Sequence, residues 1–155
     1  MADPVLTDIP MERFLLLIDM LADDLAQDAW QPDFIVGVGR GGLAPATWLS
    51  HRTGVPMLSV DLSAGVAAFG EDLLALLAER TAGGERLLFV DDINDSGRTI
   101  AGLRRALLKA GADNARFAVL IDNVTSTMQV DYRGEWIDRT VTRDWFVFPW
   151  EARPF

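Results

Sequence analysis

The sequence of 155 residues contains no cysteine and only one histidine, His51. Without cysteine the chain forms no disulfide and no cysteine-ligated zinc site. No apolar run approaches the roughly 20 residues that a membrane-spanning helix needs, and the first residues lack the apolar core of a secretion signal. We therefore expect a cytoplasmic protein without a membrane span, in which His51 lies at the surface.

Basic residues are also scarce, with 14 Lys and Arg against 23 Asp and Glu, which gives a net charge of −9. Proteins that bind nucleic acid usually carry a basic stripe. The nearest feature is formed by Arg104, Arg105 and Lys109, whose spacing is typical of the solvated face of a helix. The charge therefore argues against nucleic acid as a partner.

The residues that are present predict one α/β domain over 1–155. Half of them are hydrophobic, and a chain of this length buries roughly 68–70% of the surface that it exposes when unfolded. Strands are predicted at 34–38, 57–61, 87–91, 116–121 and 144–149, and helices at 8–27, 43–54, 71–80 and 99–110. This alternation is typical of a mostly parallel sheet with helices on both faces, whose ligands bind beyond the carboxyl ends of the strands.

A phosphate-binding pattern follows the strand predicted at 87–91. Residues 96–99, Ser-Gly-Arg-Thr, open the next helix, and the unpaired N–H groups of a helix's first turn bind anions well. Gly97 allows a ligand to approach the backbone closely, while the hydroxyls of Ser96 and Thr99 add hydrogen-bond donors. The segment therefore predicts a phosphate site.

Three acids, Asp91, Asp92 and Asp95, precede this site within five residues and by themselves would repel a phosphate. A divalent cation, or a ligand whose hydroxyls donate hydrogen bonds to carboxylates, removes that conflict. A ribose 5-phosphate satisfies both ends, and the carboxylates would also stabilise a positively charged anomeric carbon. The alternative is that the aspartates only cap the following helix, which explains one acid better than three.

A second glycine-rich stretch contains Gly37, Gly39 and Gly42, which satisfy the G-x-G-x-x-G pattern of dinucleotide-binding folds. Asp61 follows at about the spacing of the ribose-binding acid in those folds. Arg40 within the loop, however, supplies a cation for a polyanionic leaving group, and the chain leaves little room for a separate catalytic domain. A dinucleotide-dependent oxidoreductase is therefore the least favoured alternative.

Three motifs together carry a resemblance to a known family. The stretch "LLFVDDINDSGRT" resembles the phosphoribosyl-pyrophosphate signature of the type I phosphoribosyltransferases. "VGVGRGG" resembles the pyrophosphate-binding loop of their xanthine-guanine branch, and "WFVFPWE" resembles that branch's purine-contacting strand. The resemblance implies a central, mostly parallel sheet flanked by helices, with a small C-terminal hood that binds the base, at 122–155.

The resemblance further implies an enzyme that transfers a phosphoribosyl group from phosphoribosyl pyrophosphate to a purine, with guanine, xanthine or hypoxanthine favoured. The products would be the nucleoside 5′-monophosphate and pyrophosphate, the cofactor Mg²⁺, and the assembly a homodimer or homotetramer. The implied substrate-binding residues are Arg40, Gly41, Asp91, Asp92, Asp95, Ser96, Gly97, Arg98, Thr99, Asn123, Trp145 and Phe146. Asp91, Asp92 and Glu151 are the implied metal ligands, and Asp95 is the implied catalytic acid or base.

Within this set, Arg40 and Gly41 are expected to bind pyrophosphate, with a non-proline cis peptide at that place. Trp145 or Phe146 is expected to stack on the purine, while Trp150 is expected to be structural. Residues 62–85 are expected to form a mobile segment that closes over the reaction and excludes water.

The sequence also departs from the family pattern. Asn123 stands where branch members often have a lysine that contacts the 6-oxo group of the base. Its amide can still donate to a carbonyl, but asparagine is equally typical of a turn. Residues 62–85 lack the Ser-Tyr pair of some branches, because Ser63 is followed by Ala64. Alternatives are therefore a ligand-binding regulator of the same fold, or a scaffold whose base pocket has decayed.

Overall fold

The computed structural model describes residues 5–61, 67–108 and 114–152. Seven strands and four helices occupy these ranges, in the order β1 (Leu6–Asp8), α1 (Met11–Gln27), β2 (Phe34–Val38), α2 (Gly39–Thr53), β3 (Met57–Val60), α3 (Ala67–Ala82), β4 (Leu87–Asn94), α4 (Arg98–Leu108), β5 (Ala115–Asn123), β6 (Tyr132–Ile137) and β7 (Trp145–Val147). None of the helices in these ranges is both long and apolar enough to cross a membrane.

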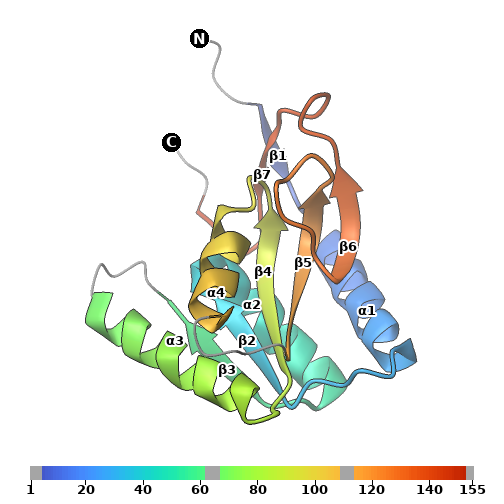
Figure 1. Cartoon of the computed structure of the whole chain (residues 1–155). Coiled ribbons are helices and arrows are strands. Elements are labelled where there is room, and N and C mark those ends of the chain that lie inside the picture. The colour runs from blue at the N-terminus through green and yellow to red at the C-terminus, as the bar shows by residue number, and fades with distance from the viewer. Residues whose placement is uncertain (1–4, 62–66, 109–113, 153–155) are drawn as a thin grey trace.

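Five strands form a central parallel sheet in the order β3-β2-β4-β5-β6, with helices on both of its faces (Figure 1). Strands β1 and β7 form a separate two-stranded parallel ribbon. Because every strand of the central sheet points the same way, its carboxyl ends meet at one edge. The predicted α/β class with a mostly parallel sheet is confirmed.

Alternating side chains divide the core into two layers. Ile35 and Leu88 point to one face of the sheet, where they pack with α1 and α2, while Val36 and Phe89 pack on the other face with α3 and α4. Successive side chains of a strand point to opposite faces, so an apolar run serves both layers at once. This explains why β2, β4 and β5 are readable from the sequence as nearly continuous apolar runs.

Some expected boundaries are wrong. Helix α1 begins at Met11 rather than at residue 8, because Pro10 is extended, with φ −68° and ψ 156°, and the residues before it pair with β7. Helix α2 begins at Gly39, so the glycine-rich stretch forms its first turn instead of a separate loop. Strand β6, which the sequence did not predict, joins the edge of the central sheet, so residues 122–155 are not a hood alone.

The segment at 62–85, which is expected to be mobile, contains helix α3 over most of its length, and its closure over the reaction stays a prediction. Helix α3 spans Ala67–Ala82, and its residues Leu77 and Ala78 are buried against the sheet. Apolar contacts of this kind anchor a helix to the core. Residues 62–66, including Ser63 and Ala64, lie outside the described ranges.

Candidate active site

A cleft of about 1050 Å³ lies at the carboxyl edge of the sheet. The ends of β2, β3 and β4, the first turns of α2 and α4, and the C-terminal tail all contribute to it. The predicted site residues among its lining are Arg40, Gly41, Asp91, Asp92, Arg98, Thr99, Trp145 and Glu151. These residues come from three segments distant in the sequence and meet in one cavity, at the edge where the parallel fold predicts a ligand.

Two glycines bring the start of α2 against the end of β4. A Cβ atom at Gly42 would collide with the carbonyl oxygen of Val90, and one at Gly41 would lie 2.5 Å from Oδ2 of Asp92. A larger residue is therefore excluded at Gly42 by backbone contact, whereas at Gly41 it would require the Asp92 side chain to move. The expected cis peptide is absent, since all peptide bonds in the described ranges are trans.

Asp91 and Asp92 form a closely interacting acidic pair at this contact. The Asp92 N–H donates to Asp91 Oδ1 at 2.9 Å, and the Ile93 N–H donates to Asp92 Oδ1 at 2.7 Å. Burial, followed by the charge of Asp92, raises the pKa of the Asp91 carboxyl well above its ordinary value. Burial also raises the pKa of Asp92, and the negative charge of Glu151 adds to the effect. Such a pair is stabilised by a proton or by a cation.

The donor set fits Mg²⁺ shared with a phosphorylated ligand. No group of three acidic or histidine side chains in the described part of the chain is arranged as a ready metal cage, so Asp91, Asp92 and Glu151 are not a preformed triad. Glu151 instead accepts the N–H of Phe148 at 2.9 Å through Oε2. Mg²⁺ is commonly bound by one or two carboxylates, with several waters and the substrate's phosphates as its other ligands. The Asp91–Asp92 pair beside Gly41 can provide the carboxylates.

The phosphate segment at 96–99 lies partly in the cleft. Arg98 and Thr99, the first residues of α4, line it, whereas Ser96 and Gly97 do not. Gly97 has φ +86°, and a Cβ there would lie 2.8 Å from both Ser126 Oγ and Thr127 Oγ1. Glycine is therefore required by the neighbouring loop as well as by backbone conformation. The Arg98 N–H donates to Ser96 Oγ at a long 3.4 Å, and the N–H groups that follow it in the first turn of α4, which have no partner within the helix, suit an anion.

The aromatic residues at the base end have different surroundings. Trp145 is 58% exposed and lines the cleft, whereas Phe146 is buried in the core beneath the Arg139 guanidinium. Trp150 also lines the cleft, stacked on Phe148 with ring centroids 5.0 Å apart, and its buried Nε1 has no hydrogen-bond partner. Of the two predicted stacking residues, only Trp145 offers a ring to the cleft, and Trp150 joins it unexpectedly.

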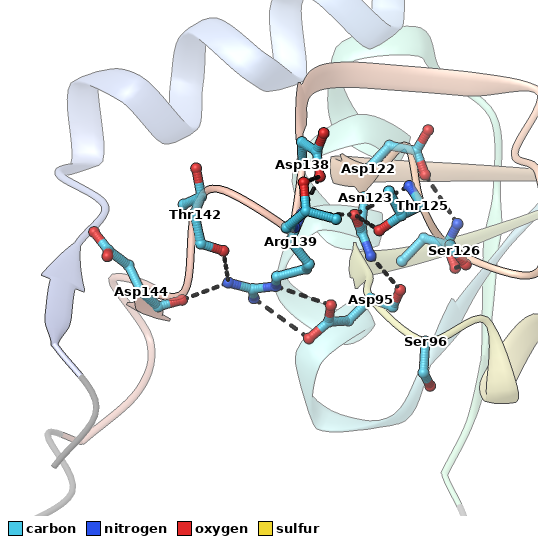
Figure 2. Close-up of polar contacts among 12 residues, drawn as sticks. Asp95, Ser96, Asp122, Asn123, Thr125, Ser126, Asp138, Arg139, Thr142 and Asp144 are labelled. Carbon is cyan, nitrogen blue, oxygen red and sulfur yellow. Dashed lines mark hydrogen bonds and ion pairs between the residues drawn. The ribbon is translucent and has the colours of Figure 1, made fainter. Parts of the chain in front are cut away.

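Asn123 is buried and its amide is occupied by the protein (Figure 2). Its Nδ2 donates to the carbonyl of Asp95 at 2.9 Å, and its Oδ1 accepts from the hydroxyl of Thr125 at 2.8 Å. Oδ1 also accepts the N–H groups of Thr125 and Arg139, both at 3.2 Å. Of the two interpretations that the sequence allowed, the turn-forming one describes these contacts.

Asp95 lies outside the cleft lining and is paired with Arg139. Nε and NH2 of Arg139 donate to the two carboxylate oxygens at 2.9 and 3.3 Å, as Figure 2 shows. No pattern in the sequence points to Arg139, because it lies 44 residues beyond Asp95 and outside the three motifs described above.

The sheet edge, the helix start and the paired acids together make a site in an α/β protein that is suited to a phosphorylated, hydroxyl-bearing ligand. Residues 9–154 match the model of the phosphoribosyl transferase domain, and the chain belongs to that family. The predicted resemblance to the type I enzymes and their xanthine-guanine branch is confirmed by the relatives described next.

A xanthine-guanine phosphoribosyltransferase of Gluconobacter oxydans is 32% identical over 124 residues, which cover 77% of this chain and 69% of that protein. An adenine phosphoribosyltransferase of the same organism is 31% identical over 105 residues, or 61% of this chain and 58% of that protein. The match thus spans little more than half of the adenine enzyme, and it spans 42% of an orotate phosphoribosyltransferase of Oceanobacillus iheyensis.

Among solved structures, a purine phosphoribosyltransferase of Pyrococcus horikoshii superposes with a TM-score of 0.72 and 26% identity, over 97% of both chains. The observed sheet and helix arrangement is therefore that of the type I phosphoribosyltransferases. The glycines Gly39–Gly42 open α2 directly after β2, as a dinucleotide fingerprint also would, and it is the family match that argues against the dinucleotide interpretation.

Proposed function

We propose that this protein transfers the phosphoribosyl group of phosphoribosyl pyrophosphate to a purine base. The observation that carries the proposal is the Asp91–Asp92 pair, two adjacent carboxyl groups that line the cleft and whose pKa values are raised chiefly by burial. The pair lies between the first turns of α2 and α4, two places suited to phosphates. A ligand with a phosphate at each end and a ribose between them matches that arrangement.

Each part of the donor substrate has a place along the cleft. The 5′-phosphate binds the start of α4 at Arg98 and Thr99, and the pyrophosphate binds Arg40 and Gly41 at the start of α2. The ribose hydroxyls donate to Asp91 and Asp92, whose negative charge also stabilises a cationic anomeric carbon. The acids therefore face the sugar, and the helix starts face its phosphates.

Bound Mg²⁺ would neutralise charge on the pyrophosphate leaving group. Asp91 and Asp92 are the side chains placed to hold it, directly or through water, with Glu151 nearby as a further negative charge. Residence in the cytoplasm and assembly as a homodimer or homotetramer remain predictions.

At the base end, Trp145 offers its exposed ring for stacking. In the transfer, the bond between the anomeric carbon and pyrophosphate breaks, and pyrophosphate leaves with the electron pair. A ring nitrogen of the base forms the new bond and loses one proton, for which the half-exposed Asp95 carboxylate is the candidate acceptor. A 6-oxopurine is the proposed base.

The test is nucleotide formation from phosphoribosyl pyrophosphate, with Mg²⁺ or with a chelator. Guanine, xanthine, hypoxanthine, adenine, uracil and orotate are offered separately, beside an Asp95→Ala variant. We expect Mg²⁺-dependent turnover of a 6-oxopurine that is strongly reduced in the variant. Turnover of adenine or a pyrimidine alone would contradict the proposed base, and no turnover of any base would contradict the proposed activity.

A second candidate is a ligand-binding regulator of the same fold. It is favoured by one observation, namely that Asn123 directs its amide to the protein rather than to the cleft. This candidate predicts binding of phosphoribosyl pyrophosphate without transfer to any of the six bases.

A further inference from the structure

The guanidinium of Arg139 joins two segments that meet beside the cleft. It donates to both carboxylate oxygens of Asp95 and, through NH1, to the carbonyls of Thr142 and Asp144 at 3.2 and 2.6 Å (Figure 2). A guanidinium carries five N–H donors, so these contacts use four of them. Arg139 therefore has little capacity left to bind a base itself.

The same connection is braced by a buried amide. Asn123 donates to the backbone carbonyl of Asp95 and accepts the backbone N–H of Arg139. Both ends of the ion pair are thus attached to one side chain of β5, and both are held relative to the central sheet. An ordinary surface ion pair, which contributes little because its side chains are free to move, has no such support.

The tail that carries Trp145 is held by the same group. Asp144, whose carbonyl accepts from Arg139, also accepts the Thr7 hydroxyl at 2.7 Å through Oδ2. The N–H of the next residue, Trp145, donates to the Val5 carbonyl at 2.8 Å. Arg139 therefore fixes the chain immediately before the one predicted stacking residue that reaches the cleft.

We propose that Arg139 is a positioning residue for the base half of the reaction, acting through Asp95 and through the placement of Trp145. The proposal rests on the proposed function. It is supported by the difference in exposure between the partners, since the Arg139 side chain is 22% exposed and that of Asp95 is 51% exposed. Asp95 keeps acceptor sites open, because two carboxylate oxygens offer about four lone pairs and Arg139 uses two of them.

The expected effect is confined to the base. Misplacement of a reacting group by about 1 Å can cost on the order of 10²-fold in rate, so Arg139→Gln should lower kcat/KM for the base by about 10-fold to 100-fold. The KM for phosphoribosyl pyrophosphate should change less than about twofold, because no contact of Arg139 reaches Arg40, Asp91 or Asp92. Arg139→Lys keeps the charge but not the fork geometry, and should recover only part of the loss.

The experiment is a double-mutant cycle of Arg139→Gln with Asp95→Asn, followed by steady-state kinetics for both substrates and by thermal melting. Arg52→Gln is the matched control, because Arg52 pairs with Asp19 at 2.7 Å on the surface of α1 and α2, away from the cleft. We expect non-additive losses in the kcat of base transfer, with Arg139→Gln lowering that kcat by less than about threefold once Asp95 is already substituted. The effect through Trp145 does not depend on Asp95 and should remain as a raised KM for the base.

Three results would overturn the inference. They are additive losses of activity in the double mutant, an equal rise in the KM values of both substrates, and an effect of Arg139→Gln no larger than that of Arg52→Gln. If Arg139→Gln melts too early to assay, the same comparison is made with Arg139→Lys, where an unchanged base kcat/KM would overturn it. A wild-type protein that transfers no base contradicts the proposed function instead. A strong effect of Asp95→Asn with none from Arg139→Gln contradicts the positioning role alone.

Discussion

At the phosphoribosyl end of the cleft, Asp91 and Asp92 are crowded together with raised pKa values beside the starts of α2 and α4, where backbone N–H groups have no partner within the helix. At the base end, Asn123 and Arg139 are instead almost fully occupied by hydrogen bonds to their own chain. The charges of the first end have no partner until a ligand binds, whereas the hydrogen bonds of the second end are made within the protein. Groups without partners therefore indicate the chemistry of the ligand, while a network that is satisfied within the protein indicates only how the chain is held in place.

The largest effect is expected where the unsatisfied groups lie. Asp92→Asn keeps the shape of the side chain but removes the charge beside Gly41, and we expect kcat to fall by about 10²-fold to 10³-fold, as for other groups that stabilise developing charge. Steady-state transfer assays measure this, with Asp19→Asn on the surface of α1 as the control. A loss below about threefold would show that the carboxylate pair does not serve the reaction.

The base end should respond through Trp145. Stacking of a base on an aromatic ring is worth about 1–3 kcal/mol by alanine substitution, so Trp145→Ala should raise the KM for the base roughly 5-fold to 150-fold. The KM for phosphoribosyl pyrophosphate should stay the same. Trp136→Ala is the matched control, because Trp136 is equally exposed, at 61%, but lies outside the cleft. Equal effects of both variants would contradict stacking on Trp145.

Placing the family's lysine at position 123 should lower the stability of the protein and leave the affinity for the base no higher. Asn123→Lys breaks the hydrogen bonds to the Asp95 carbonyl and the Arg139 N–H, and buried groups left without partners cost about 1–3 kcal/mol. We expect the free energy of unfolding in urea to fall by that amount and the affinity for guanine not to improve. A variant that is as stable as the wild type and binds guanine more tightly would show that position 123 faces the base.

The smallest effect concerns pH. Because the pKa of Asp91 is raised in the folded protein, its contribution to stability is fully present below the ordinary value of 3.8 and is lost as the pH rises through the raised pKa. Without ligand, Asp91→Asn should therefore melt at a higher temperature than the wild type at neutral pH, and the difference should shrink as the pH falls toward 3.8. Thermal melts across this range measure it, and a variant that is less stable at neutral pH would contradict the electrostatic strain.

Much of the phosphoribosyl end was predictable from sequence, because strand, acids and helix start are contiguous in residues 87–99. The base end was less so. Strand β6 was missed because it alternates exposed and buried residues at a sheet edge, and β1 because three residues beside a proline carry almost no pattern. Arg139 meets Asp95, and Trp150 meets Phe14, through contacts that are distant in the sequence, and no local spacing reports such contacts.

The glycine-rich stretch could also be predicted only in part from the sequence. The pattern around Gly37, Gly39 and Gly42 predicted a phosphate-binding loop, and the stretch does line the cleft at Gly39. The reason for Gly42, contact with the Val90 carbonyl, depends on how closely α2 approaches β4. The sequence pattern indicates that small residues are needed here, but not which neighbouring atom in the folded protein requires them.

The most direct test of the two-ended account is calorimetric titration of phosphoribosyl pyrophosphate into the protein, with Mg²⁺ and with a chelator. We expect that the chelator, or Asp92→Asn, weakens binding at least about 10-fold, or about 1.4 kcal/mol, whereas Trp145→Ala and Arg139→Gln leave it unchanged. Binding that depends on neither Mg²⁺ nor Asp92, or that is lost with Trp145 or Arg139, would contradict the division of the cleft into two ends.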